Sequence, residues 1–549
     1  MSSSGPSPRR RLKHWGWGYE DQVRPFSEVE EAAAGVRAMF GFGGEARRAV
    51  PLDEVDLRAP RIAPPKTASS GLFTDDRHER AVHALGKAYR DIVRGHAGEF
   101  PNPPDLVAFP VNEDEVTEVL DRAAELDAAV IPFGGGTSVC GGVEPRLTDS
   151  DRPSISLDLT HLDQVLEIDR ESLTARIQGG ARGPALEDQL RRDDLTLRHY
   201  PQSFEYATLG GWLATRAGGH FATGETHIDD LSQSIRAVTP NGEWQSRRLP
   251  GSGAGPSPDR LLLGSEGILG VITEAWMRVR PRPVFKASAT VEFPDFVAAA
   301  TGAVRLICQS RLGPSNCRLI DPVEALTMGA GDGSATLLLL GFESAHVPVG
   351  DLLDQAIAMA EDQGGRVTGR SVAAPGEDGA GQESSGTDRW RGAFLMAPYF
   401  RDTLVSCGVL SETFETAIPW DNFAGFHAAV TEATRTAVAE ISGAAAEGDA
   451  APRVCCRLTH VYPDGAAPYF TVLAPAVRGG EVEQWDEIKA AASQAIIDSG
   501  GTITHHHAVG RDHRPWYDQQ RPAVFADALA AAKRQIDPTG MLNPGVLIG

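Results

Sequence analysis

Three successive histidines, His505, His506 and His507, stand in a basic stretch of this 549-residue chain. Imidazole titrates near neutral pH, so such a run can transfer protons at an active site. Residues 501–504 read as a strand, which would place His505 and His507 on one face and His506 on the other. Two histidines on one face could also bind a metal ion, and a structural run is the third alternative. No carboxylate or cysteine accompanies them at metal-site spacing, which disfavours a metal ion. We favour proton transfer over a structural run because imidazole titrates near neutral pH.

Glycine-rich loops are the second feature with a chemical meaning. Gly134–Gly136, Thr137 and Ser138 follow a short apolar segment, and glycine lets backbone N–H groups approach a phosphate closely. The dinucleotide pattern G-x-G-x-x-G would need glycine where Val139 stands, and the Walker pattern would need lysine where Gly142 stands. These differences disfavour NAD on a Rossmann domain and ATP on a P-loop. A structural turn and a phosphate cradle both stay open for this loop.

Isolated arginines and a tyrosine complete the candidates. Arg401 precedes a mixed apolar run, Arg318 lies in a strand-like segment, and Tyr469 lies in a short apolar strand. Alone, such an arginine is more often a surface charge and such a tyrosine more often part of the core. The chain as a whole is acidic, with 52 Lys+Arg against 74 Asp+Glu and a net charge of −22. A local group of arginine and histidine in such a chain points to an anionic ligand.

The elements that must position these residues begin with an α/β unit. Residues 106–109 and 129–133 read as buried strands, and Asn112 with Glu115 reads as the start of an amphipathic helix. Residues 260–281 are expected to form a strand, a glycine turn and a second strand. From residue 284 onward strands and helices alternate, which indicates a second domain. The Gly-, Ser-, Glu- and Asp-rich residues 375–388 read as a solvent loop, whose role the sequence leaves open.

Composition and sequence pattern disfavour several classes of binding partner and several cellular locations. The acidic balance disfavours nucleic acid, whose binding requires a basic face. No apolar stretch of about 18 residues predicts a membrane-spanning helix. The basic start of the chain has no apolar run behind it, so no secretory signal is expected. Six cysteines without a C-x-x-C pair indicate a reducing, cytoplasmic compartment.

Three glycine-containing segments taken in order, Pro132–Ser138, Pro201–Gly219 and Leu263–Thr273, resemble the FAD-binding domain of the vanillyl-alcohol-oxidase type flavoproteins. The resemblance implies an α+β fold in which that FAD-binding domain carries a cap domain with an antiparallel sheet and flanking helices. It also implies FAD as the cofactor. We expect noncovalent binding, because no histidine lies within the first loop and Cys140, just past it, reads as a small buried residue. The implied cofactor contacts are Pro132, Phe133, Gly134, Gly135, Gly136, Thr137, Ser138, Pro201, Gln202, Ser203, Phe204, Glu205, Tyr206, Ala207, Thr208, Gly211, Thr215, Arg216, Ala217, Gly218, Glu266, Gly267, Ile268, Leu269, Gly270, Val271 and Ile272.

A longer resemblance covers nearly the whole chain. The segments HWGWGYED, LSETFETAIPWD, DGAAPYFTV, THHHAVGRDH and DPTGMLNPG resemble the alkyl-dihydroxyacetone-phosphate synthases of ether lipid biosynthesis. The resemblance implies a transferase that uses FAD without net redox change to exchange the acyl chain of an acyl-dihydroxyacetone phosphate for a fatty alcohol. It implies that Arg401 and Arg318 bind substrate and that Tyr469 and His505–His507 are catalytic. The alternative is an FAD-dependent oxidase or dehydrogenase of a 2-hydroxy acid or an alcohol.

The expected division of the chain is an N-terminal helical arm (1–100), an FAD-binding domain (101–283), a substrate or cap domain (284–515) and a C-terminal segment (516–549) that returns to the FAD domain. The expected partner is a small or lipid-like anionic substrate. Neither nucleic acid nor a constitutive membrane anchor is expected, and the predicted location is cytoplasmic with transient membrane association. The oligomeric state, a homodimer included, and the alkyl-chain length stay open.

Overall fold

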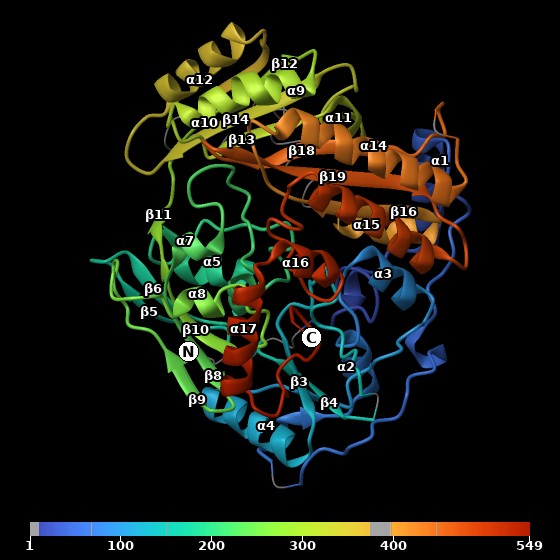
Figure 1. Cartoon of the computed structure of the whole chain (residues 1–549), viewed down its shortest axis with the longest axis vertical. Helices are drawn as coiled ribbons and strands as arrows, with labels where there is room; N and C mark the ends of the chain where they lie inside the picture. Colours follow the sequence, from blue (N-terminus) through green and yellow to red (C-terminus); the bar gives the residue numbers. More distant parts are fainter. Residues whose placement is uncertain are drawn as a thin grey trace, which may run out of the picture.

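The computed structural model describes residues 10–548 apart from 67, 150, 374–395, 397 and 446. The loop predicted at 375–388 therefore lies outside the described residues. Figure 1 shows two lobes, one above the other: an N-terminal lobe with small sheets, and a cap built on one large sheet. Within the described part of the chain, no helix combines the length and the apolar character needed to cross a bilayer.

The N-terminal lobe holds two main sheets. The first is largely parallel, as expected of an α/β unit, and the second is antiparallel. In sheet order, the first contains β1 (Phe73–Thr74), β2 (Leu106–Ala108), β4 (Ser154–Asp158) and β3 (Ala129–Phe133), and the second contains β5 (Val165–Asp169), β6 (Thr174–Gln178), β10 (Val271–Arg278), β8 (Ser232–Thr239) and β9 (Gly242–Gln245). A separate pair joins β7 (Leu195–Thr196) and β11 (Arg280–Pro281).

The helices of this lobe are short. They are α2 (Arg77–Val82), α3 (Tyr89–His96), α4 (Glu113–Glu125), α5 (Gly183–Arg191), α6 (Leu209–Thr215), α7 (Ile228–Leu231) and α8 (Asp259–Leu262). The predicted start of α4 is confirmed, because the Asn112 side chain accepts the N–H of Glu115 at 2.9 Å. The strand predicted at 260–263 is wrong, since α8 occupies that stretch. A short apolar run cannot by its pattern distinguish a strand from a helical turn.

The cap is an antiparallel sheet covered by helices. Its strands are, in order, β15 (Arg366–Ala373), β12 (Phe285–Phe293), β14 (Thr336–Ser344), β13 (Asn316–Ile320), β18 (Arg453–Val461), β19 (Gly465–Pro475) and β16 (Val409–Glu415), with β17 (Ile418–Pro419) paired to β19. The accompanying helices are α9 (Phe296–Ala299), α10 (Arg305–Gln309), α11 (Pro322–Thr327), α12 (Gly350–Asp362), α14 (Phe423–Ser442) and α15 (Glu481–Asp498). The predicted antiparallel cap with flanking helices is thus observed. In Figure 1, α9, α12 and α14 cover its outer face.

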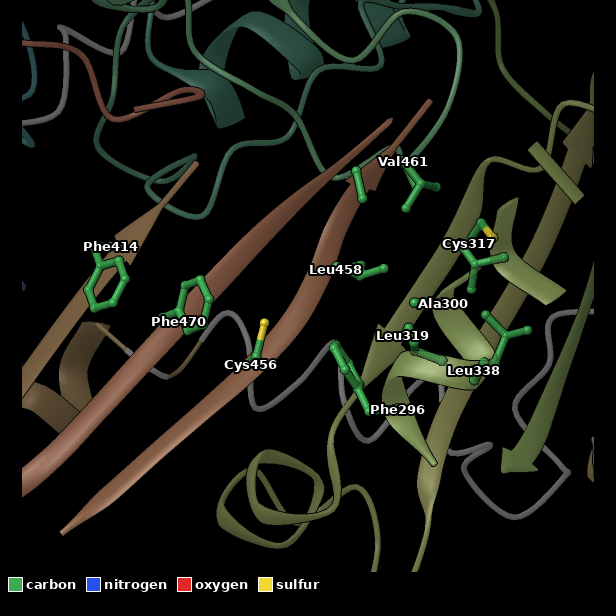
Figure 2. Packing of buried hydrophobic residues seen from close by; sticks show 14 of the residues in the cluster. Phe296, Ala300, Cys317, Leu319, Leu338, Phe414, Cys456, Leu458, Val461 and Phe470 are labelled. Atoms are coloured by element: carbon green, nitrogen blue, oxygen red, sulfur yellow. The ribbon is translucent and has the colours of Figure 1, made fainter. Parts of the chain in front are cut away.

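The period-2 geometry of these strands divides the cap into an apolar and a polar face. Phe414, Phe470 and Leu458 belong to the apolar core on the helix side (Figure 2). Successive side chains in a strand point to opposite faces. Tyr469 and Arg457, which alternate with these core residues, therefore point toward the N-terminal lobe.

Both ends of the described chain pack against these lobes. Trp17 and Tyr89 belong to the same apolar core as the cap, and α1 (Phe26–Phe40) packs beside it. After α16 (Arg514–Gln520) and α17 (Ala523–Ile536), the chain runs beside β3. There the N–H of Val130 donates to the carbonyl of Met541 at 2.8 Å, and the N–H of Asn543 donates to the carbonyl of Val130 at 2.9 Å. The domain limits given above stay predictions.

Replacing Phe470 by Ala tests the apolar face of the cap. Phe470 is fully buried and stacks on Phe414 with ring centroids 4.9 Å apart. We expect F470A to lower the free energy of unfolding by about 3–5 kcal/mol, since a large cavity replaces the ring. Urea unfolding followed by fluorescence measures this change. Phe525→Ala on α17 is the control, because Phe525 is 46% exposed; equal losses in both variants would contradict the packing described.

Candidate functional site

A cavity of about 540 Å³ lies between the N-terminal lobe and the polar face of the cap sheet. Its volume falls in the range of about 300–1,000 Å³ that is usual for small-molecule and cofactor sites. The predicted cofactor contacts that line it are Pro132, Phe133, Gly134, Gly135, Gly136, Thr137, Ser138, Pro201, Gln202, Ser203, Ala207, Thr208, Gly211, Thr215, Ala217, Gly218, Glu266, Gly267, Gly270 and Ile272. Arg401, Tyr469, His506 and His507 line the same cavity from the cap side.

The first glycine loop presents backbone rather than side chains to this cavity. A Cβ at Gly135 would overlap the carbonyl oxygen of Tyr206, and one at Gly134 would overlap the hydroxyl of Thr208. These two glycines are needed because two loops meet at backbone distance. Bare backbone N–H groups at the wall fit the phosphates of a dinucleotide such as FAD.

Asn543 supports the same interpretation from the other end of the chain. Its side-chain amide donates to the carbonyls of Gly142 and Glu266 at 3.1 and 2.8 Å. Its own Oδ1 atom is buried and has no hydrogen-bond partner in the protein, although the residue lines the cavity. Buried polar atoms normally have a partner, so this acceptor fits the donor group of a bound cofactor.

Some predicted cofactor contacts do not line the cavity, and for these a contact with the cofactor stays a prediction. The hydroxyl of Tyr206 and the carboxylate of Glu205 are each 2.5 Å from the hydroxyl of Tyr399. Arg216 forms an ion pair with Asp229 at 2.8 Å. The others are packed in the apolar interior: Phe204, Ile268, Leu269 and Val271. The resemblance assigned unbroken ranges, whereas neighbouring residues in a turn or strand face opposite sides.

One carboxylate sets the conformation of the histidine segment. The backbone N–H groups of His505, His506 and His507 donate to the carboxylate of Glu415 at 2.7, 3.1 and 2.9 Å, and the Thr504 hydroxyl donates at 2.5 Å. Three successive amides can reach one carboxylate only from a curved backbone. The strand predicted at 501–504 is therefore wrong, and so is the shared face of His505 and His507. His506 and His507 line the cavity, but His505 does not.

Burial controls the charge of these groups. It is the main cause that lowers the pKa of His506 and His507, with Glu415 opposing it at His507. Both imidazoles are therefore neutral near pH 7, as a proton acceptor must be. Burial acts to raise the pKa of the Glu415 carboxyl, but His507, His505 and the Thr504 hydroxyl outweigh it and lower this pKa.

A second carboxylate, from the N-terminal lobe, holds the continuation of the segment. Glu266 accepts the backbone N–H groups of Val509 and Gly510 at 2.9 and 2.8 Å. Burial raises the pKa of Glu266 to about 7, although both amides act to lower it. One acidic side chain from each lobe thus fixes residues 505–510 across the cavity.

Tyr469 and two arginines stand beside the histidines. The Tyr469 ring centroid is 5.5 Å from that of His507, and the guanidinium carbon of Arg457 lies 3.7 Å from the Tyr469 ring centroid. Arg457 also forms a buried ion pair with Glu324. Arg401 donates at 3.4 Å to the Thr413 hydroxyl. The arrangement joins fixed positive charge, neutral imidazoles and a phenol in one place.

Arg318 lies one strand beyond this group. It is on β13, fully buried, and donates to the carbonyl of His220 at 3.2 Å. Burial, with Arg457 nearby, lowers its pKa to about 9. It does not reach the cavity wall, so the predicted direct contact with substrate is not observed in this structure.

Several functional residues escaped the sequence analysis. Glu415 and Arg457 are the most important, and the cavity wall adds Ser411, Thr413, Thr459, His460 and Thr471. The available signal was the alternation of polar and apolar residues in β16, β18 and β19. Alternate residues of a strand point to opposite faces of the sheet. Because these strands are buried on both faces, their polar face borders the internal cavity.

Three histidines of the site are close enough together to be considered as metal ligands. One nitrogen each of His460, His505 and His506 lies within 4.8 Å of the others. However, Nε2 of His505 is 2.7 Å from the Tyr462 hydroxyl, and Nε2 of His460 is 2.6 Å from the carbonyl oxygen of Gly219. These bonds occupy the Nε2 atoms of His505 and His460, whereas Nδ1 of His460 is buried without a hydrogen-bond partner in the described part of the protein. Proton transfer stays the interpretation that we favour, beside the metal alternative.

Comparisons with known proteins agree with this geometry. Residues 104–247 match the family described as "FAD binding domain", and residues 282–547 match "FAD linked oxidases, C-terminal domain". A solved structure titled "alkyldihydroxyacetonephosphate synthase in P212121" superposes with a TM-score of 0.79 at 25% identity, covering 99% of this chain and 100% of that one. The chain is an FAD-dependent enzyme with the predicted α+β fold.

The relatives narrow this class further. Alkyldihydroxyacetonephosphate synthase of Caenorhabditis elegans is 32% identical over 496 residues, covering 87% of this chain and 81% of the relative. That of Dictyostelium discoideum is 31% identical over 507 residues, covering 86% and 78%. FAD-linked oxidoreductases and dehydrogenases are more distant, at 23–25% identity. The chain belongs to the alkyldihydroxyacetonephosphate synthase family.

Gly135→Ala tests the close approach of the glycine loops. The added methyl group would overlap the Tyr206 carbonyl and push the loop into the cavity, so we expect purified G135A to have lost most of its flavin absorbance. Gly425→Ala in α14 is the control, because no atom lies within 4 Å of its Cβ position. Full flavin content in G135A would contradict the phosphate-cradle interpretation.

Glu415→Gln tests the carboxylate that holds the histidines. Hydrogen bonds to charged groups contribute about 1.5–3 kcal/mol each. We therefore expect E415Q to lower the free energy of unfolding by about 3 kcal/mol at neutral pH. The folded-state pKa of Glu415 is depressed. Its stabilisation is therefore present above the ordinary carboxyl pKa of about 4.3 and is lost as the pH falls through the folded value.

Urea unfolding of both proteins across this pH range measures the effect. The gap between wild type and E415Q should narrow with acidification, while exposed Glu440→Gln should follow wild type throughout. A gap that does not change with pH would contradict the assignment of the charge to Glu415.

Proposed function

We propose that the protein exchanges the acyl chain of an acyl-dihydroxyacetone phosphate for a fatty alcohol, using FAD without net redox change. The observation that carries the proposal is the cavity itself. In it, glycine loops suited to FAD face Arg401, Arg457, Tyr469, His506 and His507 on the polar face of the cap. Membership of the alkyldihydroxyacetonephosphate synthase family supports the same reaction.

We infer that FAD is bound noncovalently. Cys140 is the thiol next to the first glycine loop, and it is buried with its Sγ 3.2 Å from the carbonyl oxygen of His507. Burial raises the pKa of this thiol well above its ordinary value, so it is not a reactive thiolate. When bound, FAD supplies a flavin ring that can take up and return an electron pair at the substrate's first carbon.

The basic side chains of the wall would hold the phosphate of the substrate. A guanidinium group binds phosphate through charge-assisted, often bidentate hydrogen bonds. Arg457 is already paired with Glu324, whereas Arg401 contacts a hydroxyl and a carbonyl at 3.4 and 3.5 Å. Arg401 therefore keeps more of its donor capacity for a ligand.

We assign proton transfer to His506, His507 and Tyr469. Exchange at the substrate's first carbon requires a base that removes a proton there and an acid that returns one. His506 and His507 are neutral because burial lowers their pKa, and Tyr469 lies beside them. The curved backbone held by Glu415 keeps both rings directed at the cavity.

The cavity wall also offers apolar side chains that suit an apolar chain. They are Met328, Met396, Pro398, Phe400 and Leu404. Met396 is 59% exposed and Phe400 37% exposed, so apolar surface continues to the outside. This supports a lipid-like anionic substrate and transient membrane contact without an anchor. The six free cysteines support a reducing, cytoplasmic location.

An exchange assay under an oxygen electrode tests the function. The FAD-loaded protein should incorporate a long-chain alcohol into acyl-dihydroxyacetone phosphate and release fatty acid without consuming oxygen. No incorporation would overturn the proposal. Anaerobic bleaching of the flavin by a 2-hydroxy acid or an alcohol, with oxidised product released, would favour the oxidase or dehydrogenase alternative.

Tyr469→Phe tests the phenol in the site. We expect Y469F to lower kcat by about 100- to 10,000-fold, the usual contribution of a positioned acid–base group, with little change in KM or flavin content. Tyr517→Phe on α16 is the control, because Tyr517 lies outside the cavity. A wild-type kcat in Y469F would remove this residue from the chemistry and leave the histidines.

A further inference from the structure

A chain of hydrogen bonds leads from His506 away from the cavity. Nδ1 of His506 and Nδ1 of His505 are 3.0 Å apart, and Nε2 of His505 is 2.7 Å from the hydroxyl oxygen of Tyr462. That hydroxyl is 2.8 Å from Oγ1 of Thr226. His505, Tyr462 and Thr226 do not line the cavity, so substrate binding does not explain them.

The outer end of this chain of hydrogen bonds lies near the molecular surface. Tyr462 is half-buried and precedes exposed Pro463 and Asp464. Thr226 is buried, but it follows exposed Glu225 and precedes half-buried His227, whose Nδ1 is 3.4 Å from the Thr226 hydroxyl. The inner end, His506, belongs to the cavity wall. The bonds therefore lead from the site to Tyr462 and His227, two half-buried side chains beside exposed loop residues.

His505 is the central member, and its surroundings keep it neutral. His460, His506 and His227 face it, together with Glu415. Burial is the main cause that lowers its pKa, and the three imidazoles act in the same direction, while Glu415 opposes them. A neutral imidazole that is hydrogen-bonded at both nitrogens can accept a proton at one and release a proton from the other.

The proposed reaction releases one proton in each turnover. An acyl ester and an alcohol give an ether and a carboxylic acid, and the acid ionises at neutral pH. Each turnover therefore yields one carboxylate and one proton, and no other reactant is needed for the balance. Once the acid has ionised, this proton has to leave the site separately from the carboxylate.

We propose that His505, Tyr462 and Thr226 are positioning residues that form a proton path from His506 to solvent. Only N–H and O–H bonds form and break along it. The inference rests on the proposed function, because that reaction supplies the proton. Other chemistry that releases a proton at His506 would use the same path.

Tyr462→Phe removes one hydroxyl from the path and keeps the ring. We expect the FAD-loaded Y462F protein to exchange acyl for alkyl chains about 100-fold more slowly, the lower end of what a positioned proton-transfer group contributes. KM for the acyl substrate should not change. Rising concentrations of imidazole buffer should restore part of the rate, because a small carrier replaces the missing link. Thr226→Val should show the same pattern, and Tyr517→Phe should behave as wild type.

A second readout separates failure of the path from failure of the proposed function. In protein labelled with ¹⁵N-histidine, NMR should show that Y462F shifts the ring-nitrogen resonances of both His505 and His506, whatever the reaction. Resonances of His506 that do not move would overturn the path, as would wild-type turnover in Y462F or a lost rate that no buffer restores. Absence of exchange in the wild-type protein, with the NMR shifts present, would overturn the function and leave the path.

Discussion

The candidate site depends on the binding of three successive backbone amides to the carboxylate of Glu415. This carboxylate is at the end of β16, and the histidines that it holds are about ninety residues further along the chain. This carboxylate holds residues 505–507 in a curve, whereas the sequence pattern of residues 501–504 predicts an extended backbone. The curvature separates His505 from His506 and His507, so neighbouring residues of the same type take different places in the protein.

The cap sheet places the remaining groups by alternation. One face carries the apolar core under α9 and α14, and the other carries Arg457, Tyr469 and their neighbours. Because the strands are paired in register, Arg457 lies opposite Tyr469, and the guanidinium stacks on the phenol ring. The N-terminal lobe, with its glycine loops, forms the opposite wall of the cavity that this face borders. An acidic protein thereby keeps a basic cavity inside.

Much of this arrangement could be predicted from the sequence, and the part that could not has a physical reason. The strand at 129–133, the helix start at Asn112 and the antiparallel cap follow from local patterns and from the resemblance. Glu415 and Arg457 were missed because their partners are distant in the chain. The resemblance predicts that Arg318 and Tyr206 contact ligands, because a motif identifies the stretch of chain near a site. It does not say which way each side chain of that stretch points, since tertiary packing determines this.

The backbone pairing of Val130 with residues 541–543 has a consequence for biosynthesis. β3 and the first glycine loop leave the ribosome about four hundred residues before the segment that borders them. Asn543, which contributes to the wall of the cavity, arrives with that segment. A nascent chain therefore cannot complete this wall of the cavity until residues 541–543 have been added, however early its N-terminal lobe begins to fold.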